Sequence, residues 1–282
     1  MKVLIIMSFL HHKNKSGIEM MMEHLQWEYK YGNIEDIPNY DAIYFPDQPY
    51  DSSIYPKKIF IFGPHFSMYP DDKLLQINNN YKNSVYIQPS KWCIEPWKEA
   101  TKILPVKALP FPVDTKKFIP GNERNKVFIY HKNNRYKDLQ VIKQFLFKQG
   151  VEYCIFDYNE RYKETDYLSI LKQAKYGIIV DLHESQGFAI LEALSCNVPL
   201  LVWDAKNICC YPTRKIHCTT IPYWDNICGE VFYTENELNN KYNEFIQKLN
   251  YYNPRKYILE NLDVDSCAEN LKILVESIKT LM

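Results

Sequence analysis

The sequence predicts an α/β protein composed of two doubly wound domains, and three observations support this fold class. The chain has 282 residues, of which 46% are hydrophobic, so it can form two modest cores. Short apolar runs of β-type composition alternate with helical segments in both halves. A proline-containing segment, residues 109–121, separates the halves, because its prolines do not fit a central strand or a helix interior.

The N-terminal half begins with an apolar run after a single lysine, which we interpret as a first buried strand. Further short apolar runs follow, separated by segments of helical or loop composition. The expected strands are residues 2–7, 42–45, 58–62 and 85–87, with a helix over residues 18–29. This order is typical of a parallel α/β domain.

The second half shows a more regular alternation of strand and helix patterns. The expected strands are residues 127–130, 153–156, 176–180 and 199–203, and the expected helices are residues 137–149, 166–174, 188–195, 235–249 and 266–281. We therefore predict an N-terminal domain over residues 1–112, a C-terminal domain over 113–262 and a terminal helix over 263–282. A ligand crevice is expected at the carboxyl ends of strands, between the two domains.

Charge and cysteine content narrow the functional classes. Thirty-four lysines and arginines balance 34 aspartates and glutamates, so nucleic acid is not expected as a partner. The first apolar run is too short for a transmembrane segment or a signal-peptide core, which predicts a cytoplasmic protein with no transmembrane segment. Eight cysteines without Cys-x-x-Cys spacing are expected to be reduced thiols, and the role of Cys209 and Cys210 stays open.

Residues 176–204 carry the most informative pattern. A buried strand leads to Glu184, and a helix opens at Gly187 and Phe188 before it reaches Glu192. The unpaired N–H groups and the dipole at such a helix start favour a diphosphate. Glu184 then reaches sugar hydroxyls and Glu192 a ribose diol. The spacing alone favours the alternative that the two carboxylates complement the helix dipole.

These residues carry a resemblance to a known family. Glu184 and Glu192, separated by seven residues that include Gly187, resemble the Glu-x7-Glu signature of retaining GT-B glycosyltransferases, and the chain is most similar to the glycosyltransferase family 4 type. Residues 16–19 resemble the N-terminal glycine loop of that family, and residues 112–120 resemble its linker. The resemblance implies the GT-B fold, with two facing Rossmann-like domains, a cleft between them and a shortened N-terminal domain. The C-terminal helix is expected to pack back on the N-terminal domain.

The resemblance also implies roles for basic residues after the strand over residues 127–130. Lys132 and Lys137 stand where the family carries an arginine and a lysine that hold the donor diphosphate. Lysine lacks the two-pronged donor geometry of arginine, so Arg135 is an alternative phosphate ligand. Without the resemblance, a solvated loop is the favoured explanation of Lys132, Arg135 and Lys137.

Three further residues complete the predicted site. His65 follows an apolar run and resembles the family's active-site histidine near the donor sugar. Gly17 lies in the segment that resembles the glycine loop, where the family carries two glycines and this chain has Ser16 before Gly17. Tyr158 is expected to contact the donor base. Together the predicted catalytic residues are Glu184, His65 and Lys137.

The expected activity is transfer of a hexosyl or pentosyl group from a nucleoside-diphosphate sugar to a glycan or glycoconjugate hydroxyl, with retention of anomeric configuration. UDP and GDP are the expected donor nucleotides, and neither a metal nor a cofactor is expected. Asp263-Val264-Asp265 matches an Asp-x-Asp metal motif, but we assign it to helix capping. The alternatives are a non-catalytic nucleotide- or glycan-binding module and a sugar-nucleotide epimerase. The oligomeric state is not predicted.

Overall fold

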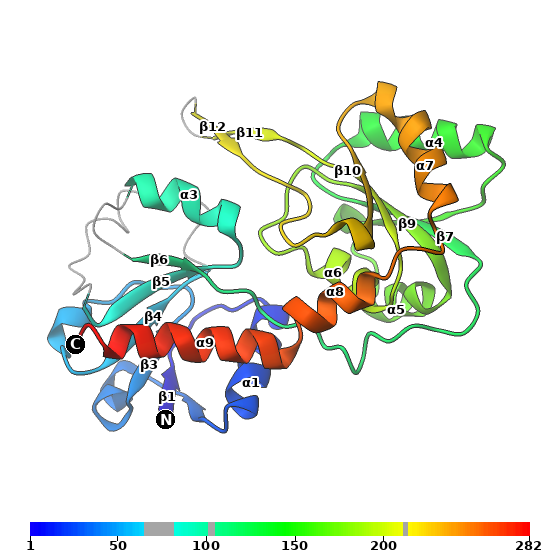
Figure 1. Ribbon diagram of the computed structural model, residues 1–282. Helices are drawn as coiled ribbons and strands as arrows, with labels where there is room; N and C mark the ends of the chain where they lie inside the picture. The colour runs from blue at the N-terminus through cyan, green and yellow to red at the C-terminus, as the bar shows by residue number, and fades with distance from the viewer. Residues whose placement is uncertain (65–81, 101–104, 211–213) are drawn as a thin grey trace. The chain divides into compact units, whose positions relative to one another are not determined.

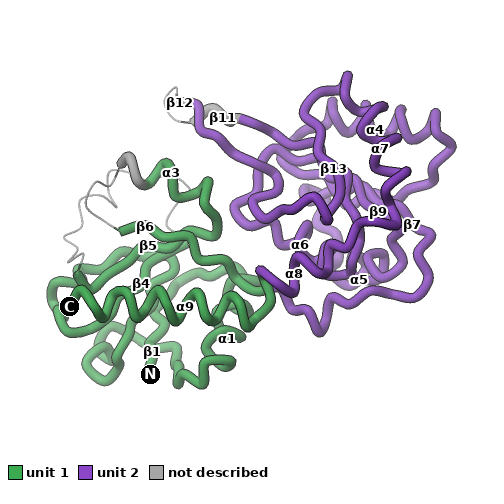
Figure 2. The backbone as a smooth tube through the Cα atoms, in the orientation of Figure 1, with its two compact units in different colours: residues 1–112, 262–282 green, residues 113–261 purple. Residues whose placement is uncertain are grey.

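The structure of the protein is a computed structural model that describes residues 1–64, 82–100, 105–210 and 214–282. The chain divides into two compact units (Figures 1 and 2). Unit 1 contains residues 1–112 and 262–282, and unit 2 contains residues 113–261. Each unit is built around its own parallel sheet, which confirms the predicted fold class.

Unit 1 has a six-stranded parallel sheet in the order β2-β1-β3-β4-β5-β6. Its apolar strands are buried on both sides, as a parallel sheet requires. The elements are β1 (Lys2–Ile5), α1 (His12–His24), β2 (Glu28–Tyr31), η1 (Ile34–Asn39), β3 (Ala42–Phe45), η2 (Ser52–Ile54), β4 (Ile59–Phe62), β5 (Ser84–Gln88), α3 (Lys91–Ala100), β6 (Val106–Ala108) and α9 (Val264–Lys279).

Helix α9 completes unit 1 from the other end of the chain. It packs beside α1 and reaches β4 (Figure 1). The expectation that the C-terminal helix packs on the N-terminal domain is therefore confirmed. Asp263 is the N-cap of α9, and its carboxylate accepts a hydrogen bond of 2.9 Å from the Ser266 N–H. The capping role assigned to the Asp-x-Asp segment is thus confirmed, with the helix beginning at Val264.

The prediction for residues 13–31 was wrong in two ways. The segment that resembles the glycine loop, residues 16–19, belongs to α1, and the helix predicted over residues 18–29 starts later and ends later than the observed one. Gly17 lies inside α1, where glycine is otherwise unfavourable. A Cβ atom at residue 17 would lie 2.9 Å from the Phe111 Cβ, so the close packing there requires a glycine. Gln26, in a left-handed conformation (φ 55°), then leads the chain out of the helix and into edge strand β2, which pairs with β1.

Unit 2 has a five-stranded parallel sheet in the order β13-β10-β9-β7-β8. Its elements are β7 (Lys126–His131), α4 (Tyr136–Lys148), β8 (Cys154–Asp157), η3 (Tyr158–Glu160), α5 (Glu164–Gln173), β9 (Ala174–Val180), α6 (Phe188–Ser195), β10 (Leu200–Trp203), β11 (Asn207–Cys210), β12 (Arg214–His217), η4 (Asn226–Cys228), β13 (Gly229–Phe232), η5 (Glu235–Glu237), α7 (Leu238–Gln247) and α8 (Pro254–Asn261). The antiparallel pair β11–β12, strand β13 and helix α8 were not predicted.

The unit 2 core forms where helices α4 and α7 cover one face of the sheet. Leu139, Ile142 and Leu146 recur at helical spacing along α4 and are buried with Ile129 and Ile178 of the central strands. This amphipathic spacing is why the sequence indicated the helix so clearly. This core packs against the central strands β7 and β9, between which the strand order reverses.

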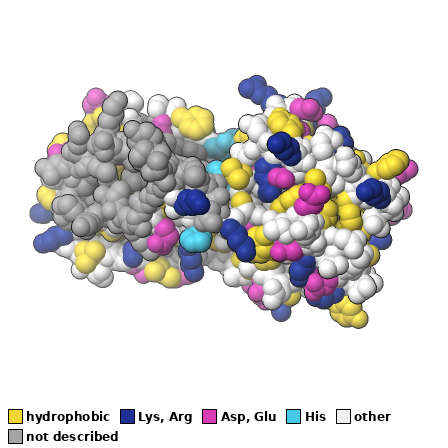
Figure 3. Space-filling model, turned by 90° about the horizontal axis from the view of Figure 1, so that it is seen from above, with side chains coloured by type: hydrophobic (Ala, Val, Ile, Leu, Met, Phe, Trp, Pro, Cys, Tyr) yellow, Lys and Arg dark blue, Asp and Glu magenta, His cyan; other side chains and the backbone are white. Residues whose placement is uncertain are grey.

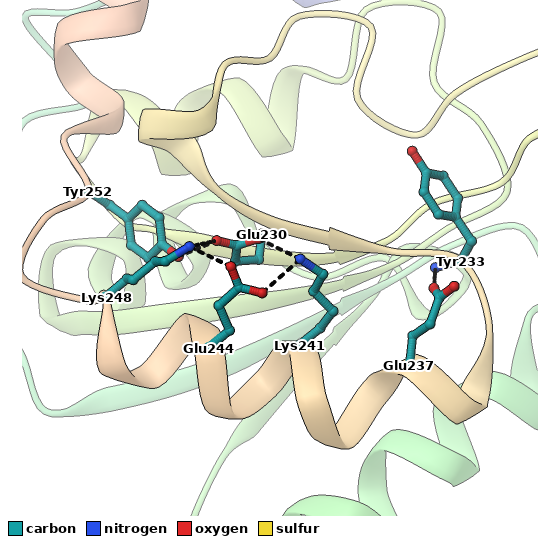
Figure 4. A network of polar contacts seen from close by, with 7 residues as sticks. All are labelled: Glu230, Tyr233, Glu237, Lys241, Glu244, Lys248 and Tyr252. Atoms are coloured by element: carbon teal, nitrogen blue, oxygen red, sulfur yellow. Dashed lines mark hydrogen bonds and ion pairs between the residues drawn. The ribbon is translucent and has the colours of Figure 1, made fainter.

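A polar network ties α7 to edge strand β13 (Figure 4). Glu230 of β13 receives the ammonium groups of Lys241 at 3.2 Å and Lys248 at 3.0 Å, and both lysines also pair with Glu244. The Tyr252 hydroxyl donates to Glu230 at 3.0 Å. Hydrogen bonds from the two lysines lower the pKa of Glu244 to about 2. This network secures the outer edge of the sheet, away from its central strands.

Candidate functional site

The candidate site lies at the carboxyl ends of β7 and β9 in unit 2. These strands are neighbours, with His131 opposite Val180 in the register, although β8 follows β7 in the chain. The strand order reverses between them, which is where open α/β sheets bind ligands. The residues that follow both strands therefore lie at one edge of the sheet.

Lys132 and Glu184 meet at this edge. The Lys132 Nζ lies 2.7 Å from the Glu184 Oε1, and the two side chains are only 21% and 10% exposed. Burial alone would lower the pKa of Lys132, but the carboxylates of Glu184 and Asp181 outweigh it and raise that pKa. The ammonium also lies 4.7 Å from the centroid of the Tyr158 ring. The structure thus brings together three of the predicted donor-site residues.

Asp181 is a component of the site that the sequence reasoning missed. It is fully buried, and its Oδ1 accepts hydrogen bonds of 2.6 Å from the Asn133 Nδ2 and from the Leu182 N–H. Burial, followed by the charge of Glu184, raises the pKa of Asp181 to about 8. Its place directly after a buried strand was the available signal. We call Lys132, Asn133, Asp181 and Glu184 the strand-end cluster.

Arg135 is engaged with protein groups. Its Nη1 donates to the carbonyl oxygens of Asp181 at 2.5 Å and Trp203 at 2.8 Å, and its Nε pairs with Asp138 at 2.6 Å. These bonds join the ends of β9 and β10 to the first turn of α4. In this arrangement Arg135 supports the strand-end cluster, while its predicted contact with phosphate stays a prediction. Lys137 is exposed in the same first turn of α4.

Helix α6 begins at the same edge of the sheet. Gly187 adopts a left-handed conformation (φ 79°, ψ 50°), and the first intrahelical bond runs from the Leu191 N–H to the Gly187 carbonyl at 3.0 Å. The N–H groups of residues 188–190 therefore have no partner within the helix. Together with the helix dipole they favour an anion.

Glu192 lies within α6 and is only 4% exposed. Burial, followed by the charge of Glu192, raises the pKa of the Tyr162 hydroxyl. The two predicted carboxylates, Glu184 and Glu192, thus belong to one buried, electrostatically connected region of unit 2.

Two arginines anchor the far end of α6. The Arg124 guanidinium donates to the Asn197 carbonyl at 2.7 Å and to the Cys196 carbonyl. Arg255 donates to the Ser195 carbonyl at 2.6 Å. Helix C-termini leave carbonyl groups unpaired, and these arginines satisfy them. These bonds fix the C-terminal end of the helix that carries Glu192.

Replacing Gly187 with alanine is expected to weaken nucleotide binding. A Cβ atom at residue 187 would lie 3.3 Å from the Glu184 Cβ, and the left-handed backbone adds a strain of about 1 kcal/mol. We expect a loss in affinity of about tenfold or more, measured by calorimetry. Gly150→Ala is the matched control, because Gly150 has a similar φ of 65° with nothing within 4 Å of a Cβ. Equal nucleotide affinity in the two variants would contradict the assignment of the start of α6 to nucleotide binding.

The remaining predictions fall outside this cluster or outside the described residues. His65 belongs to residues 65–81, which the structure does not describe. Gly17 lies in α1 of unit 1. Among the described residues, no group of three histidine, cysteine, aspartate or glutamate side chains is placed to hold a metal ion. No described helix is both long and apolar enough to span a membrane. Basic and acidic side chains are interspersed on the face of unit 2 that Figure 3 shows.

No family model matches this sequence, and no curated protein matches it. Solved structures do match its fold. The lipopolysaccharide outer core galactosyltransferase WaaB superposes with a TM-score of 0.63 at 13% identity, over 100% of both chains. Sucrose-phosphate synthase from Thermosynechococcus elongatus gives 0.59 at 10% identity, also over 100% of both chains. The catalytic domain of starch synthase IV from Arabidopsis thaliana, bound to ADP and acarbose, gives 0.54 at 10% identity, over 96% of this chain and 78% of that one.

These likenesses extend over nearly the whole chain and include both units. Sequence identities of 10–13% show a shared fold and nothing finer. The two parallel-sheet, Rossmann-like units of this protein therefore form the GT-B fold found in glycosyltransferases.

Proposed function

We propose that the protein is a glycosyltransferase that transfers a hexosyl or pentosyl group from a nucleoside-diphosphate sugar to a hydroxyl of a glycan or glycoconjugate. The observation that carries this proposal is the buried Lys132–Glu184 pair, at 2.7 Å, beside the start of α6. It combines a cation, a helix N-terminus and a carboxylate at the strand-order reversal of unit 2. The shared fold supports the same conclusion.

The chemical difficulty of glycosyl transfer is charge separation. As the bond between sugar and phosphate loosens, negative charge grows on the leaving diphosphate and positive charge grows on the sugar ring. In our proposal, Lys132, Lys137 and the N–H groups at Gly187 and Phe188 stabilise the diphosphate. The backbone N–H groups are fixed by the start of α6 before the reaction, so their orientation adds little to the barrier.

The carboxylates bind the neutral parts of the donor. Glu184 positions the sugar, and Glu192 accepts hydrogen bonds from the ribose. Tyr158 lies against Lys132 and is about half exposed, so its ring face is available to the nucleotide base. The leaving phosphate takes the acceptor proton on the same face of the sugar, which gives retention without a metal ion. We propose that this activity is cytoplasmic. The roles of His65 and Gly17 stay predictions.

A donor screen tests the proposal. UDP-, GDP-, ADP- and dTDP-sugars are incubated with the protein, and thermal stabilisation and nucleoside-diphosphate release are measured. We expect one of them to raise the melting temperature and to be consumed. Lys137→Ala is expected to lower donor turnover by about 100-fold, since a charge that stabilises the leaving group is lost. Lys148→Ala, an exposed change on the same helix, is the control.

The outcomes separate the alternative activities. A non-catalytic module is stabilised by nucleotide but releases no nucleoside diphosphate. An epimerase converts the donor in the absence of an acceptor, and product analysis reveals the altered sugar. Absence of both stabilisation and turnover with all four donor classes would overturn the proposed function.

A further inference from the structure

The strand-end cluster contains more negative than positive charge. Asp181 and Glu184 both lie beside Lys132, which pairs directly with Glu184. With both carboxylates ionised, one ammonium group opposes two carboxylates. A bound nucleoside diphosphate adds at least two further negative charges to this part of unit 2. Removal of one of these negative charges favours binding, because like charges in a buried site oppose each other strongly.

Asp181 is the carboxyl group whose environment favours the neutral form. Glu184 holds the ammonium of Lys132 at 2.7 Å, whereas Asp181 receives only neutral donors, the Asn133 amide and the Leu182 N–H. The second oxygen of Asp181, Oδ2, is buried and has no hydrogen-bond partner among the described residues. A buried oxygen without a partner stabilises a carboxylate poorly and accommodates a proton well.

The charged and titratable neighbours of Asp181 come from several elements. His131, Lys132 and Arg135 follow or end β7, and His183 and Glu184 share the turn before α6. Burial, followed by nearby negative charges that include Asp181, raises the pKa of Tyr130 of β7. Asp204 lies beyond Thr220, which bonds both to Asp204 and to the Asp181 carbonyl. The charge of Lys132 lowers the pKa of Asp181, against the effects of burial and of Glu184.

We propose that Asp181 carries a proton whenever a nucleoside diphosphate occupies the strand-end cluster, so that donor binding is coupled to proton uptake by this residue. This inference rests on the proposed function, because it requires the diphosphate to bind beside Lys132. A bound phosphate attracts the Lys132 ammonium, so this cation lowers the pKa of Asp181 less. The phosphate also adds negative charge near Asp181. Both changes favour the neutral carboxyl group. Asp181 is thereby a positioning residue that adjusts the charge of the site.

The inference predicts proton uptake at alkaline pH. In the free protein the pKa of Asp181 is raised to about 8. At pH 8.5 such a group is about one quarter protonated, so complete protonation on binding takes up roughly three quarters of a proton. Through this linkage, affinity is expected to fall by about fivefold between pH 8 and pH 9 and by about tenfold for each further pH unit. The terminal phosphate of a nucleoside diphosphate, with a pKa of about 6, is fully ionised there.

Calorimetric titration of the full chain with UDP, GDP, ADP and dTDP tests the inference. Binding heats are measured at pH 8.5 in two buffers of different ionisation enthalpy, which yields the number of protons taken up. Asp181→Asn is the matched variant, because an amide oxygen can accept the same two hydrogen bonds and cannot titrate. Wild type is expected to take up protons when the nucleotide binds. The number of protons taken up by Asp181→Asn is expected to be smaller by roughly three quarters of a proton.

The possible failures are distinguishable. Binding with equal proton uptake in both forms would overturn the role of Asp181 and leave the proposed function intact. Absence of binding by both forms for all four nucleotides would overturn the proposed function and this inference with it. If Asp181→Asn does not fold, the measurement on wild type alone tests the proposal. Nucleotide binding by wild type at pH 8.5 without proton uptake would contradict it.

Discussion

Replacing Glu184 with glutamine is expected to reduce donor turnover by about 100-fold or more while unit 2 stays folded. Glutamine preserves the size of the side chain and its ability to accept a hydrogen bond from the Lys132 Nζ. It removes the charge that opposes this ammonium at 2.7 Å and that, in our proposal, orients the donor sugar. Nucleoside-diphosphate release at saturating donor measures the effect on the chemical step.

Glu152→Gln is the matched control for this experiment. Glu152 is exposed in the segment before β8, so the same chemical change there is expected to leave turnover unaltered. Circular dichroism and the melting temperature of both variants show whether unit 2 remains folded. Turnover of Glu184→Gln within a factor of about two of wild type would remove Glu184 from the proposed site.

Replacing Arg255 with alanine is expected to lower the free energy of unfolding by about 3 kcal/mol. The Arg255 guanidinium donates to the carbonyl oxygens of Phe118 at 2.8 Å and Thr115 at 3.0 Å in the linker, as well as to Ser195 at the end of α6. Truncation leaves three carbonyl groups without these donors. Denaturant unfolding monitored by tryptophan fluorescence measures the change.

Lys256→Ala provides the comparison on the same helix. Lys256 is 60% exposed and forms only a loose ion pair with Glu260 at 3.8 Å, so its removal is expected to cost less than about 0.5 kcal/mol. Arg255→Lys is expected to fall between the two, because one ammonium cannot reach all three carbonyl groups. If Arg255→Ala and Lys256→Ala unfold at the same denaturant concentration, the bridging role of Arg255 is wrong.

The predictability of the fold depended on how each element is buried. Strands β9 and β10 of unit 2 are mostly apolar because a parallel sheet is covered on both faces, and this pattern was recognisable, whereas edge strand β13 contains the charged Glu230 and was not predicted. Strand β2, with the sequence Glu-Tyr-Lys-Tyr, lies at a sheet edge and is half exposed, so its composition resembles a helix surface. The start of α1 was obscured by Gly17, whose reason is a contact with Phe111, distant in sequence.

The candidate site was predictable where a local motif carried it. Glu184, Gly187 and Glu192 occur within one strand–turn–helix segment, so a single stretch of sequence identifies them. Asp181 and Arg135 are different, because their partners come from other strands. Only the pairing of β7 with β9 brings Asn133 to Asp181 and Arg135 to the Asp181 carbonyl. Local spacing contains no information about these contacts.

The return of α9 to unit 1 has a consequence for synthesis on the ribosome. Unit 2 is one continuous segment, residues 113–261, whose strands and covering helices emerge together. Unit 1 lacks the helix that covers part of its sheet until residues 262–282 have been translated. Part of the apolar surface of unit 1 therefore stays uncovered by α9 while about 150 further residues are synthesised. Leu271 and Val275 of α9 are buried only after that. In vectorial folding, the N-terminal unit is the last to be completed.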